Sequence, residues 1–297
     1  MKNFSFIKNF KITALIAIIL ILIGIGSFIF QGFNFDIDFT GGTTMTVDFN
    51  KTLDREELDK ISDTVAEVIG ENPSSVQKAG EDGNLAIIKT QDLDSTKRDE
   101  VFEKLKTTYN LSDDDKISVD NVDSVVGKDL RDSAIISLTV ALVLMLVYIA
   151  IRFEFVTGIV AIIALAHDVL IMMLIQSLFQ LPLNLTFVAA LLTIVGYSIN
   201  NTIIIFDRVR ENKRLASKKE TFEEIIDKSV RQTLTRSINT TITTLITITI
   251  LYFIGVQSIK IFALPIIVGL IAGFYSSVFL AGPLWAFLRK AGFGVKK

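Results

Sequence analysis

Six long apolar runs constrain this chain more than any other feature of its sequence. They cover approximately residues 13–30, 134–151, 156–178, 183–206, 238–259 and 261–288. A membrane core about 30 Å thick is crossed by a helix of roughly 20 apolar residues, so each run is long enough to span it. Half of the residues are hydrophobic, yet 21% are charged, which fits a membrane protein with a sizeable polar part. We predict a polytopic α-helical membrane protein with six transmembrane helices.

The residue types present exclude several classes of function. The sequence has no cysteine and a single histidine, His167. A disulfide framework, a thiol nucleophile and a multi-histidine metal site are therefore excluded. The sequence also lacks a Walker loop, a Gly-x-Ser-x-Gly elbow and a cluster of metal ligands. We expect a transport protein that is not an enzyme and that holds no cofactor or metal.

The basic residues are segregated along the chain. With six helices, alternate connections and both termini fall on one side of the membrane. The lysines and arginines of that side are Lys2, Lys8, Lys11, Arg152, Arg208, Arg210, Lys213, Arg214, Lys218, Lys219, Lys228, Arg231, Arg236, Arg289, Lys290, Lys296 and Lys297. The short opposite connections carry only Lys260. By the positive-inside rule we expect a multi-pass protein of the cytoplasmic membrane, with both termini and a loop at 207–236 in the cytoplasm.

The segment 32–132 then forms a domain outside the membrane. It lies between residues 1–31, the cytoplasmic N-terminus with the first helix, and residues 133–297, which hold the other five helices. The segment contains 12 Lys and Arg residues and 24 Asp and Glu residues, a net charge of −12. An acidic surface argues against nucleic acid as a partner.

Strands and helices alternate in this outer domain. Strands are predicted at 44–49, 74–80, 84–90 and 115–126, and helices at 53–70 and 94–109. The order βαββαβ is that of a ferredoxin-like α+β domain. Gly41 and Gly42 precede the first strand and permit backbone angles that other residues avoid. Two interpretations of this pair remain open, a linker turn and a family-specific role.

One acidic residue stands near the middle of an apolar run. Asp168 follows His167 in the third run. Ionisable residues in a membrane core are costly and usually functional, so Asp168 is a candidate carrier of a proton or cation. The alternative is that its carboxyl group only hydrogen-bonds a neighbouring helix. His167 points about 100° away from Asp168 on an ideal helix, which favours a packed histidine.

The fourth run carries Gly196, Tyr197, Asn200 and Asn201 near its second half. The small residues Gly196 and Ser198 predict a close contact with another helix. The two amides can bridge helices, but they cannot titrate.

The fifth run places a cation and several hydroxyl groups on one face. Arg236, Thr240, Thr244 and Thr247 share that face at helical spacing. We expect the threonines to hydrogen-bond across helices or to line a wet path. Arg236 is either a snorkelling anchor or a fixed positive charge that faces a buried acid.

Four stretches form a specific combination: FDIDFTGGT (35–43), RFEFVTGIVAIIALAHD (152–168), LPLNLTFVAALLTIVGYSINNTIIIFDRVREN (181–212) and RSINTTITTL (236–245). Together they resemble the SecD/SecF family of protein-export membrane proteins, and within it the SecF type. The resemblance covers the whole chain. The positions that match the family motifs are Asp38, Gly41, Gly42, Gly196, Tyr197, Asp207 and Arg208.

This resemblance implies a fold like that of the resistance–nodulation–division (RND) transporters, in which six helices make one half of a pseudo-symmetric bundle. The other half is then a second protein, SecD. The implied function is an accessory complex that uses the proton gradient to help exported, unfolded polypeptides finish crossing at the SecYEG channel. SecA acts there indirectly, YajC is a further candidate partner, and membrane lipid surrounds the complex.

The chain departs from the family at one position. The family motif reads GYSIND, and its aspartate is assigned to proton passage, whereas this chain has Asn201. Asparagine keeps the hydrogen-bonding capacity and loses the titration. The arginine that matches Arg236 is the proposed partner of that aspartate. We expect the titrating acid to lie in SecD; the alternatives are a larger role for Asp168 and, more weakly, coupling to sodium.

Two other functions compete with protein export. The chain is alternatively a free-standing RND-type lipid or drug exporter, although such proteins usually carry twelve helices in one chain. It is also conceivable as a scaffold that stabilises the channel without ion coupling. The charged run from Asp207 is expected to be a solvated cytoplasmic helix or loop that fixes topology and contacts anionic lipid. The less favoured alternative is that Asp207 and Arg208 gate the cytoplasmic end.

Overall fold

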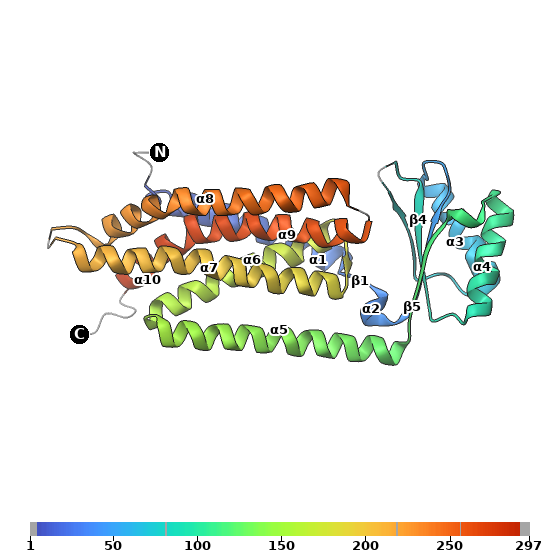
Figure 1. Ribbon diagram of the computed structural model, residues 1–297, viewed down its shortest axis with the longest axis horizontal. Helices are drawn as coiled ribbons and strands as arrows, with labels where there is room; N and C mark the ends of the chain where they lie inside the picture. The colour runs from blue at the N-terminus through green and yellow to red at the C-terminus, as the bar shows by residue number, and fades with distance from the viewer. Residues whose placement is uncertain (1–4, 81, 218, 256, 292–297) are drawn as a thin grey trace. The chain divides into compact units, whose positions relative to one another are not determined.

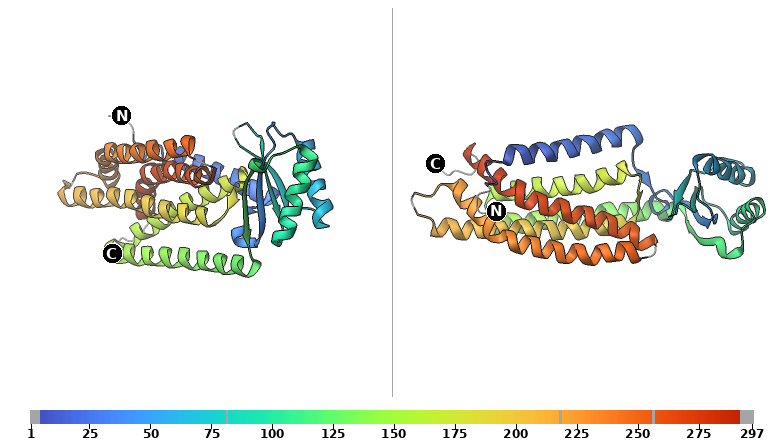
Figure 2. Two further views of the ribbon diagram at one scale, coloured as in Figure 1. Left: turned by 45° about the vertical axis from the view of Figure 1, so that its right-hand side comes forward. Right: turned by 90° about the horizontal axis from the view of Figure 1, so that it is seen from above.

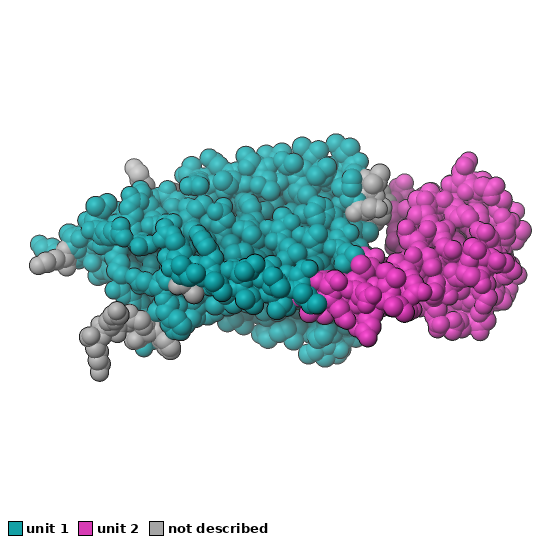
Figure 3. Space-filling model, turned by 60° about the horizontal axis from the view of Figure 1, so that its bottom comes forward, with its two compact units in different colours: residues 1–34, 136–297 teal, residues 35–135 magenta. Residues whose placement is uncertain are grey.

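The computed structural model describes residues 5–80, 82–217, 219–255 and 257–291. Lys2, Lys218, Lys296 and Lys297, and with them both termini, lie outside the described residues. The chain divides into two compact units (Figure 3), Phe35–Ile135 on the one hand and Met1–Asn34 with Ile136–Lys297 on the other. Each unit has its own apolar core.

Six helical spans within the described residues are long and apolar enough to cross a membrane (Figure 1), so the predicted architecture is confirmed. The first five are α1 (Phe10–Gln31), α5 (Ser124–Arg152), α6 (Phe155–Leu178), α7 (Leu185–Leu215) and α8 (Phe222–Ile254). The sixth consists of α9 (Gln257–Tyr275), the π-helical stretch η2 (Ser276–Ala281) and α10 (Gly282–Lys290). The two-residue strands β1 (Asn34–Phe35) and β6 (Pro182–Leu183) flank α1 and α7 in the sequence.

The charged connection at 207–236, predicted as a helix or a loop, is helical, so its interpretation as a loop is wrong. Helix α7 continues to Leu215 and α8 starts at Phe222, so only residues 216–221 connect them. The run is rich in Arg, Lys and Glu, which are good helix formers, and it also supplies buried apolar residues such as Val209 and Ile226. The chain therefore forms a helical hairpin here, which we call the 207–236 hairpin.

The predicted boundary between the last strand and the second span is also wrong. Strand β5 ends at Val122, and α5 already starts at Ser124, ten residues before the predicted apolar run. Val125 and Val126 extended the strand pattern in the sequence, but they lie on the exposed first turn of α5. The polar residues that follow are compatible with helix, so helix formation starts outside the apolar run.

The Phe35–Ile135 unit has the predicted order βαββαβ. Its elements are β2 (Gly42–Asp48), α3 (Arg55–Ile69), β3 (Ser75–Ala79), β4 (Leu85–Thr90), α4 (Ser95–Tyr109) and β5 (Lys116–Val122), with the short α2 (Ile37–Thr40) and η1 (Asp113–Asp115). The sheet is antiparallel in the order β3-β4-β2-β5. Alternate residues of β2, Met45 and Val47, are buried against Ile61 and Leu105 of the two helices. Binary patterning was therefore sufficient to predict this unit.

Local capping defines where α3 begins. Asp54 accepts a hydrogen bond from the Glu57 backbone N–H at 2.8 Å, and Glu57 accepts one from the Asp54 N–H at 3.1 Å, a reciprocal capping box. The Lys51 ammonium, followed by this backbone N–H, holds the pKa of Glu57 below its ordinary value.

Small residues set the spacing of the membrane helices. A Cβ on Gly24 of α1 would stand 2.2 Å from the Leu174 Cβ of α6, and one on Gly269 of α9 would stand 2.6 Å from Ile194 of α7. The helices approach closely at these points because a side chain is absent. By contrast, α5 lies at the margin of the bundle (Figures 1 and 2) and is the least buried of the six spans.

At one end of the bundle, α10 and the first residues of α1 pack against the 207–236 hairpin. The Asp227 carboxylate accepts hydrogen bonds from the backbone N–H groups of Phe6 and Ile7, at 2.9 and 3.1 Å. The buried Trp285 of α10 packs edge-on against Phe222 of α8. We call this end the hairpin end; it carries most of the segregated basic residues.

The glycine pair before β2 is sterically required. Gly42 has a φ of +126°, and a Cβ there would lie 2.4 Å from the Thr90 carbonyl oxygen on β4. Gly41 has a φ of +71°, and its Cβ would lie 2.5 Å from the Ser124 Cα. The two glycines therefore allow the chain to pass from α2 to β2 in close contact with two other backbone segments. They are a steric requirement and not only a flexible linker.

We predict that Gly42→Ala destabilises the Phe35–Ile135 unit by about 2 kcal/mol or more, since it combines backbone strain with a clash against a carbonyl. Hydrogen–deuterium exchange of β2 and β4 in the detergent-purified chain measures the effect. Gly70→Ala is the control, because Gly70 also has a positive φ of +82° but its Cβ would meet nothing within 4 Å. Equal protection in the two variants would contradict the clash.

Candidate functional site

Asp168 lies at the centre of a buried polar cluster in the helix bundle. Its side chain on α6 is fully buried. One carboxylate oxygen, Oδ2, accepts hydrogen bonds from the Ser198 hydroxyl of α7 and, at 2.8 Å, from the Ser276 hydroxyl of η2. The other oxygen, Oδ1, lies 2.8 Å from His167 Nδ1. Three separate elements therefore meet at one carboxyl group.

The π-helical stretch places two consecutive serines in this region. Ser276 reaches Asp168, and Ser277 lies 2.8 Å from the Thr202 hydroxyl of α7. Both serines are fully buried. A π-helical turn widens the helix and re-aims its side chains, and such turns occur frequently at functional sites.

The expectation that His167 points away from Asp168 is wrong. Although the two Cβ directions differ, the imidazole turns back and its Nδ1 atom contacts the carboxylate. The ring also stacks on Tyr275, with 6.0 Å between ring centroids, and the Tyr275 hydroxyl donates to the Thr13 carbonyl of α1 at 2.6 Å. Within the described residues His167 Nε2 has no hydrogen-bond partner.

The cluster is chemically suited to either protonation state of Asp168. A serine hydroxyl donates to a carboxylate, and after rotation it accepts from a carboxylic acid. Ser198 and Ser276 can therefore satisfy the group in both states without moving a helix. This versatility fits both interpretations of Asp168, an ion-path residue and a structural contact.

A second polar layer lies between α7 and α8. Ser237 donates to Asn201 Oδ1 at 2.7 Å, and the Tyr197 hydroxyl donates to Thr241 at 3.0 Å. Asn201 is buried, and its Nδ2 group has no partner among the residues that the structure describes. The Asn201 side chain thus links α7 to α8 through its oxygen, and its Nδ2 group is left able to donate further hydrogen bonds.

Asn200, Gly196, Arg236 and Thr240 are all exposed on the helix surface. Of the two small residues predicted at a helix contact, Ser198 is buried, whereas Gly196 makes no close contact within this chain, because a Cβ there would meet nothing within 4 Å. The Thr240 hydroxyl donates to the Arg236 carbonyl of its own helix at 2.9 Å, and the wet path stays a prediction. In the described residues no ion pair within 4.0 Å involves Arg236.

These exposed residues share one side of the bundle. The contacts Asn201–Ser237 and Tyr197–Thr241 run in opposite directions along the two helices, so α7 and α8 are antiparallel neighbours. The residue before each contact position, Asn200 on α7 and Arg236 on α8, is turned by about 100° to the same side. We call Gly196, Asn200, Arg236 and Thr240 the polar face.

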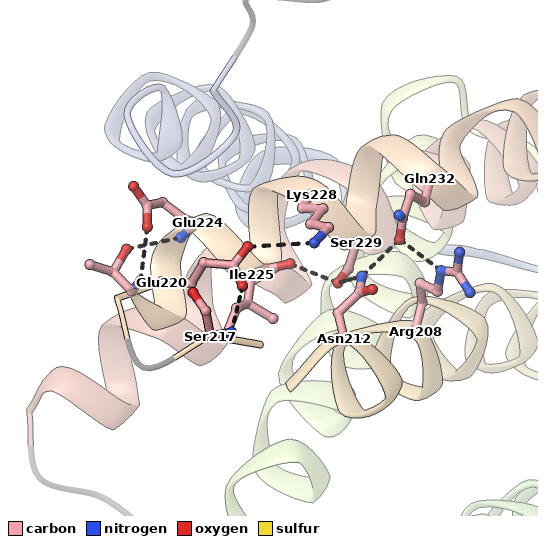
Figure 4. Close-up of polar contacts among 10 residues, drawn as sticks. Arg208, Asn212, Ser217, Glu220, Glu224, Ile225, Lys228, Ser229 and Gln232 are labelled. Atoms are coloured by element: carbon pink, nitrogen blue, oxygen red, sulfur yellow. Dashed lines mark hydrogen bonds and ion pairs between the residues drawn. The ribbon is translucent and has the colours of Figure 1, made fainter. Parts of the chain in front are cut away.

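Asp207 and Arg208 lie where the hairpin leaves the bundle. Asp207 pairs with Arg152 at 3.4 Å. Arg208 donates to Gln232 at 2.7 Å, and Asn212 donates to Ser229 and Gln232 (Figure 4). These contacts join α7 to α8. Their proposed gating role stays a prediction.

The remaining family-motif positions belong to the Phe35–Ile135 unit. Asp38 is half-buried on α2, and Gly41 and Gly42 form the turn into β2. Their geometry accounts for the pair as a structural requirement of that unit.

The cluster partners Ser198, Thr202, Ser276 and Ser277 were not among the predicted site residues. Hydroxyl residues are common in membrane helices because they can bond to their own backbone, so their presence is a weak signal. Their spacing relative to Asp168 becomes visible only when α6, α7 and η2 are packed together.

Comparisons with known proteins give a consistent result. The family model described as protein export membrane protein SecD/SecF, C-terminal, matches residues 101–291, and the SecD/SecF GG motif matches residues 26–52. The chain is 36% identical to the protein translocase subunit SecF of Sebaldella termitidis, over 97% of this chain and 92% of that protein. It is 37% identical to SecF of Acidaminococcus fermentans, over 98% of this chain and 99% of that protein.

Solved structures agree with the sequence comparisons. The chain matches the crystal structure of SecDF, a translocon-associated membrane protein from Thermus thermophilus, with a TM-score of 0.86 and 31% identity. The match covers 97% of this chain and 39% of the SecDF chain. A second SecDF structure, in a super-membrane-facing form, matches with a TM-score of 0.68 and 33% identity over the same shares.

We predict that Ser276→Ala lowers the free energy of unfolding by about 1–3 kcal/mol, because a buried carboxylate loses one of its donors. Thermal unfolding in detergent measures the change. Ser27→Ala is the control, since the Ser27 hydroxyl is only partly buried and its partners, Gln31 Nε2 at 2.7 Å and the Ser177 hydroxyl at 3.3 Å, are uncharged. If both variants unfold alike, Ser276 contributes no more than a partly buried hydroxyl with uncharged partners.

Proposed function

We propose a function from one premise: the chain belongs to the SecD/SecF family of protein-export membrane proteins. It acts as a SecF-type subunit in Sec-dependent protein export, with SecD as its membrane partner. It transports and is not itself an enzyme. The chain couples the proton-motive force to late steps of export. It lies in the cytoplasmic membrane, with the hairpin end in the cytoplasm.

The polar face is the observation that carries the proposal of a partner. The amide, guanidinium and hydroxyl groups of the polar face are exposed on α7 and α8, and α8 exposes further polar residues beside them, Asn239 and Thr243, among apolar ones such as Ile242 and Ile246. Polar groups that face lipid are unfavourable, whereas they stabilise contacts between helices of two proteins. The chain also spans only 39% of the SecDF chain that it matches, so most of that chain has no counterpart here. A second membrane protein that covers the polar face is therefore expected.

The same geometry supports placing the titrating acid in SecD. Asn201 cannot carry a proton, and Asp168 is enclosed by its own three partners. Arg236 is exposed on the side that the partner would cover, where a carboxylate from SecD could meet it. The further proposed partners are the SecYEG channel, SecA and the exported polypeptide, and YajC remains a candidate. The alternative energy source is a sodium gradient.

We predict that leucine at two positions of the polar face, Asn200→Leu with Thr240→Leu, lowers the amount of SecD that copurifies by about three- to tenfold. Each lost interhelical hydrogen bond between membrane helices weakens association by roughly 0.6–1.7 kcal/mol. Quantitative copurification of tagged chain with SecD measures this. Ser137→Leu with Thr139→Leu is the control, because it makes the same type of change on exposed positions of α5. Undiminished SecD capture by the polar-face variant would reject this surface.

We predict that Arg236→Ala abolishes the stimulation of export by a proton gradient, whereas Asp168→Asn and Asn201→Asp retain it. The assay follows preprotein import into vesicles that contain SecYEG, SecA, SecD and this chain, with a proton or sodium gradient imposed. Lys290→Ala controls for loss of a cation. If Asp168→Asn abolishes the stimulation while the complex still assembles, the proton path runs through this chain. If only a sodium gradient stimulates preprotein import, the coupling ion is sodium and not the proton.

A further inference from the structure

A hollow opens at the hairpin end beside α7. It has a volume of about 530 Å³ and is lined by Arg152, Asp207, Arg210, Glu211, Arg214 and Leu215. A smaller hollow of about 220 Å³ shares Arg152 and Arg210 with it and extends to the indole of Trp285. The larger volume lies within the range of roughly 300–1,000 Å³ that is usual for small-ligand sites.

The acidic residues around these hollows are already paired. The three pairs are Arg152–Asp207 at 3.4 Å, Arg208–Glu211 at 2.6 Å and Lys213–Glu154 at 3.4 Å. Arg210 and Arg214 are exposed, and among the described residues neither has an ion pair within 4.0 Å. Two guanidinium groups in the larger hollow are therefore available to an anion.

Their spacing suits a phosphate group. Arg210 and Arg214 stand one turn apart on α7, so their side chains leave the helix on the same face. Guanidinium groups bind phosphate oxygens in bidentate fashion. Arg152, at the end of α5, lines the same hollow from another helix; because its Nη2 group pairs with Asp207, it offers its other N–H groups to a headgroup but no net charge.

The surroundings of the hollow indicate a lipid phosphate. Ile151, Phe155 and Leu215 have exposed fractions of 83%, 80% and 77%. Ile151 and Phe155 flank the short connection from α5 to α6, and Leu215 lines the hollow itself. Large exposed apolar side chains next to free cations at the end of membrane-spanning helices match the boundary between acyl chains and headgroups.

We propose that this hollow binds the headgroup phosphate of an anionic phospholipid such as phosphatidylglycerol, with Arg210 and Arg214 as its main ligands. Arg152 shares the headgroup from α5. Because α5 is the least buried span, a headgroup held between Arg152 and the two arginines of α7 ties this marginal helix to the bundle. The site is independent of SecD and of protein export.

Trp285 makes the proposal testable. It is the sole tryptophan of the chain and lines the smaller hollow, so quenching of its fluorescence by brominated lipid reports on occupancy. The full chain is placed in phosphatidylcholine nanodiscs with increasing amounts of brominated phosphatidylglycerol. We expect saturable quenching, and we expect Arg210→Gln with Arg214→Gln to weaken the apparent affinity about 30-fold, the effect of removing two cations next to an anionic lipid.

Lys219→Gln with Lys290→Gln is the matched control, since it removes two exposed cations that do not line either hollow. It should bind as the unchanged chain does. Equal melting temperatures of all variants in pure phosphatidylcholine verify that they are folded. Equal quenching by brominated phosphatidylcholine, or equal affinity of both double variants, would overturn the proposal. Displacement of the lipid by inorganic phosphate at millimolar concentration would reassign the site to a soluble anion.

Discussion

The buried Asp168 carboxyl group sets the condition that the membrane unit must satisfy. Transferring a carboxylate into an apolar interior is unfavourable unless hydrogen bonds and neighbouring polar groups compensate for lost water. Here the compensation comes from His167 of the same helix, Ser198 of α7 and Ser276 of η2. The positions of α6, α7 and the last span are therefore coupled, because a shift of any one of them leaves an oxygen without its donor.

The π-helical stretch contributes to the same condition. Ser276 of η2 donates to Asp168 of α6, and Ser277 lies 2.8 Å from the Thr202 hydroxyl of α7. Both serines are therefore paired where α9 continues into α10.

The two polar layers of α7 have different chemistry. Ser198 faces the enclosed carboxyl group, while Asn200 and Asn201, less than one turn further on, face α8 and the exposed side. The inner layer holds a carboxyl group and is enclosed by protein. The outer layer, among the described residues, holds amides and hydroxyls but no carboxyl group, and its Asn201 Nδ2 group has no partner there. A coupling mechanism that needs a titrating group on the outer side must obtain it from another protein.

Sequence patterns predicted the parts of the structure that depend on periodicity. The six spans follow from apolar runs, and the Phe35–Ile135 unit follows from alternation at Met45 and Val47 and from helical spacing at Ile61 and Val65. The cluster around Asp168 could not be predicted in the same way. His167 reaches its partner through side-chain rotation, and Ser198 and Ser276 are separated from Asp168 by 30 and 108 residues. Both depend on packing that no local pattern encodes.

The 207–236 hairpin shows that charge did not decide between the two predicted forms of this segment, a helix or a loop. Charged residues there mark the end of the hydrocarbon region, but they do not end the helices. With 31 and 33 residues, α7 and α8 are about 46 and 50 Å long, against a membrane core of about 30 Å. Buried contacts such as Asn212–Ser229 and the packing of Val209 and Ile226 make the extension continuous with the bundle. Because the hairpin continues the helices that carry the polar face, a displacement of α7 against α8 at that face would be transmitted rigidly to the hairpin end.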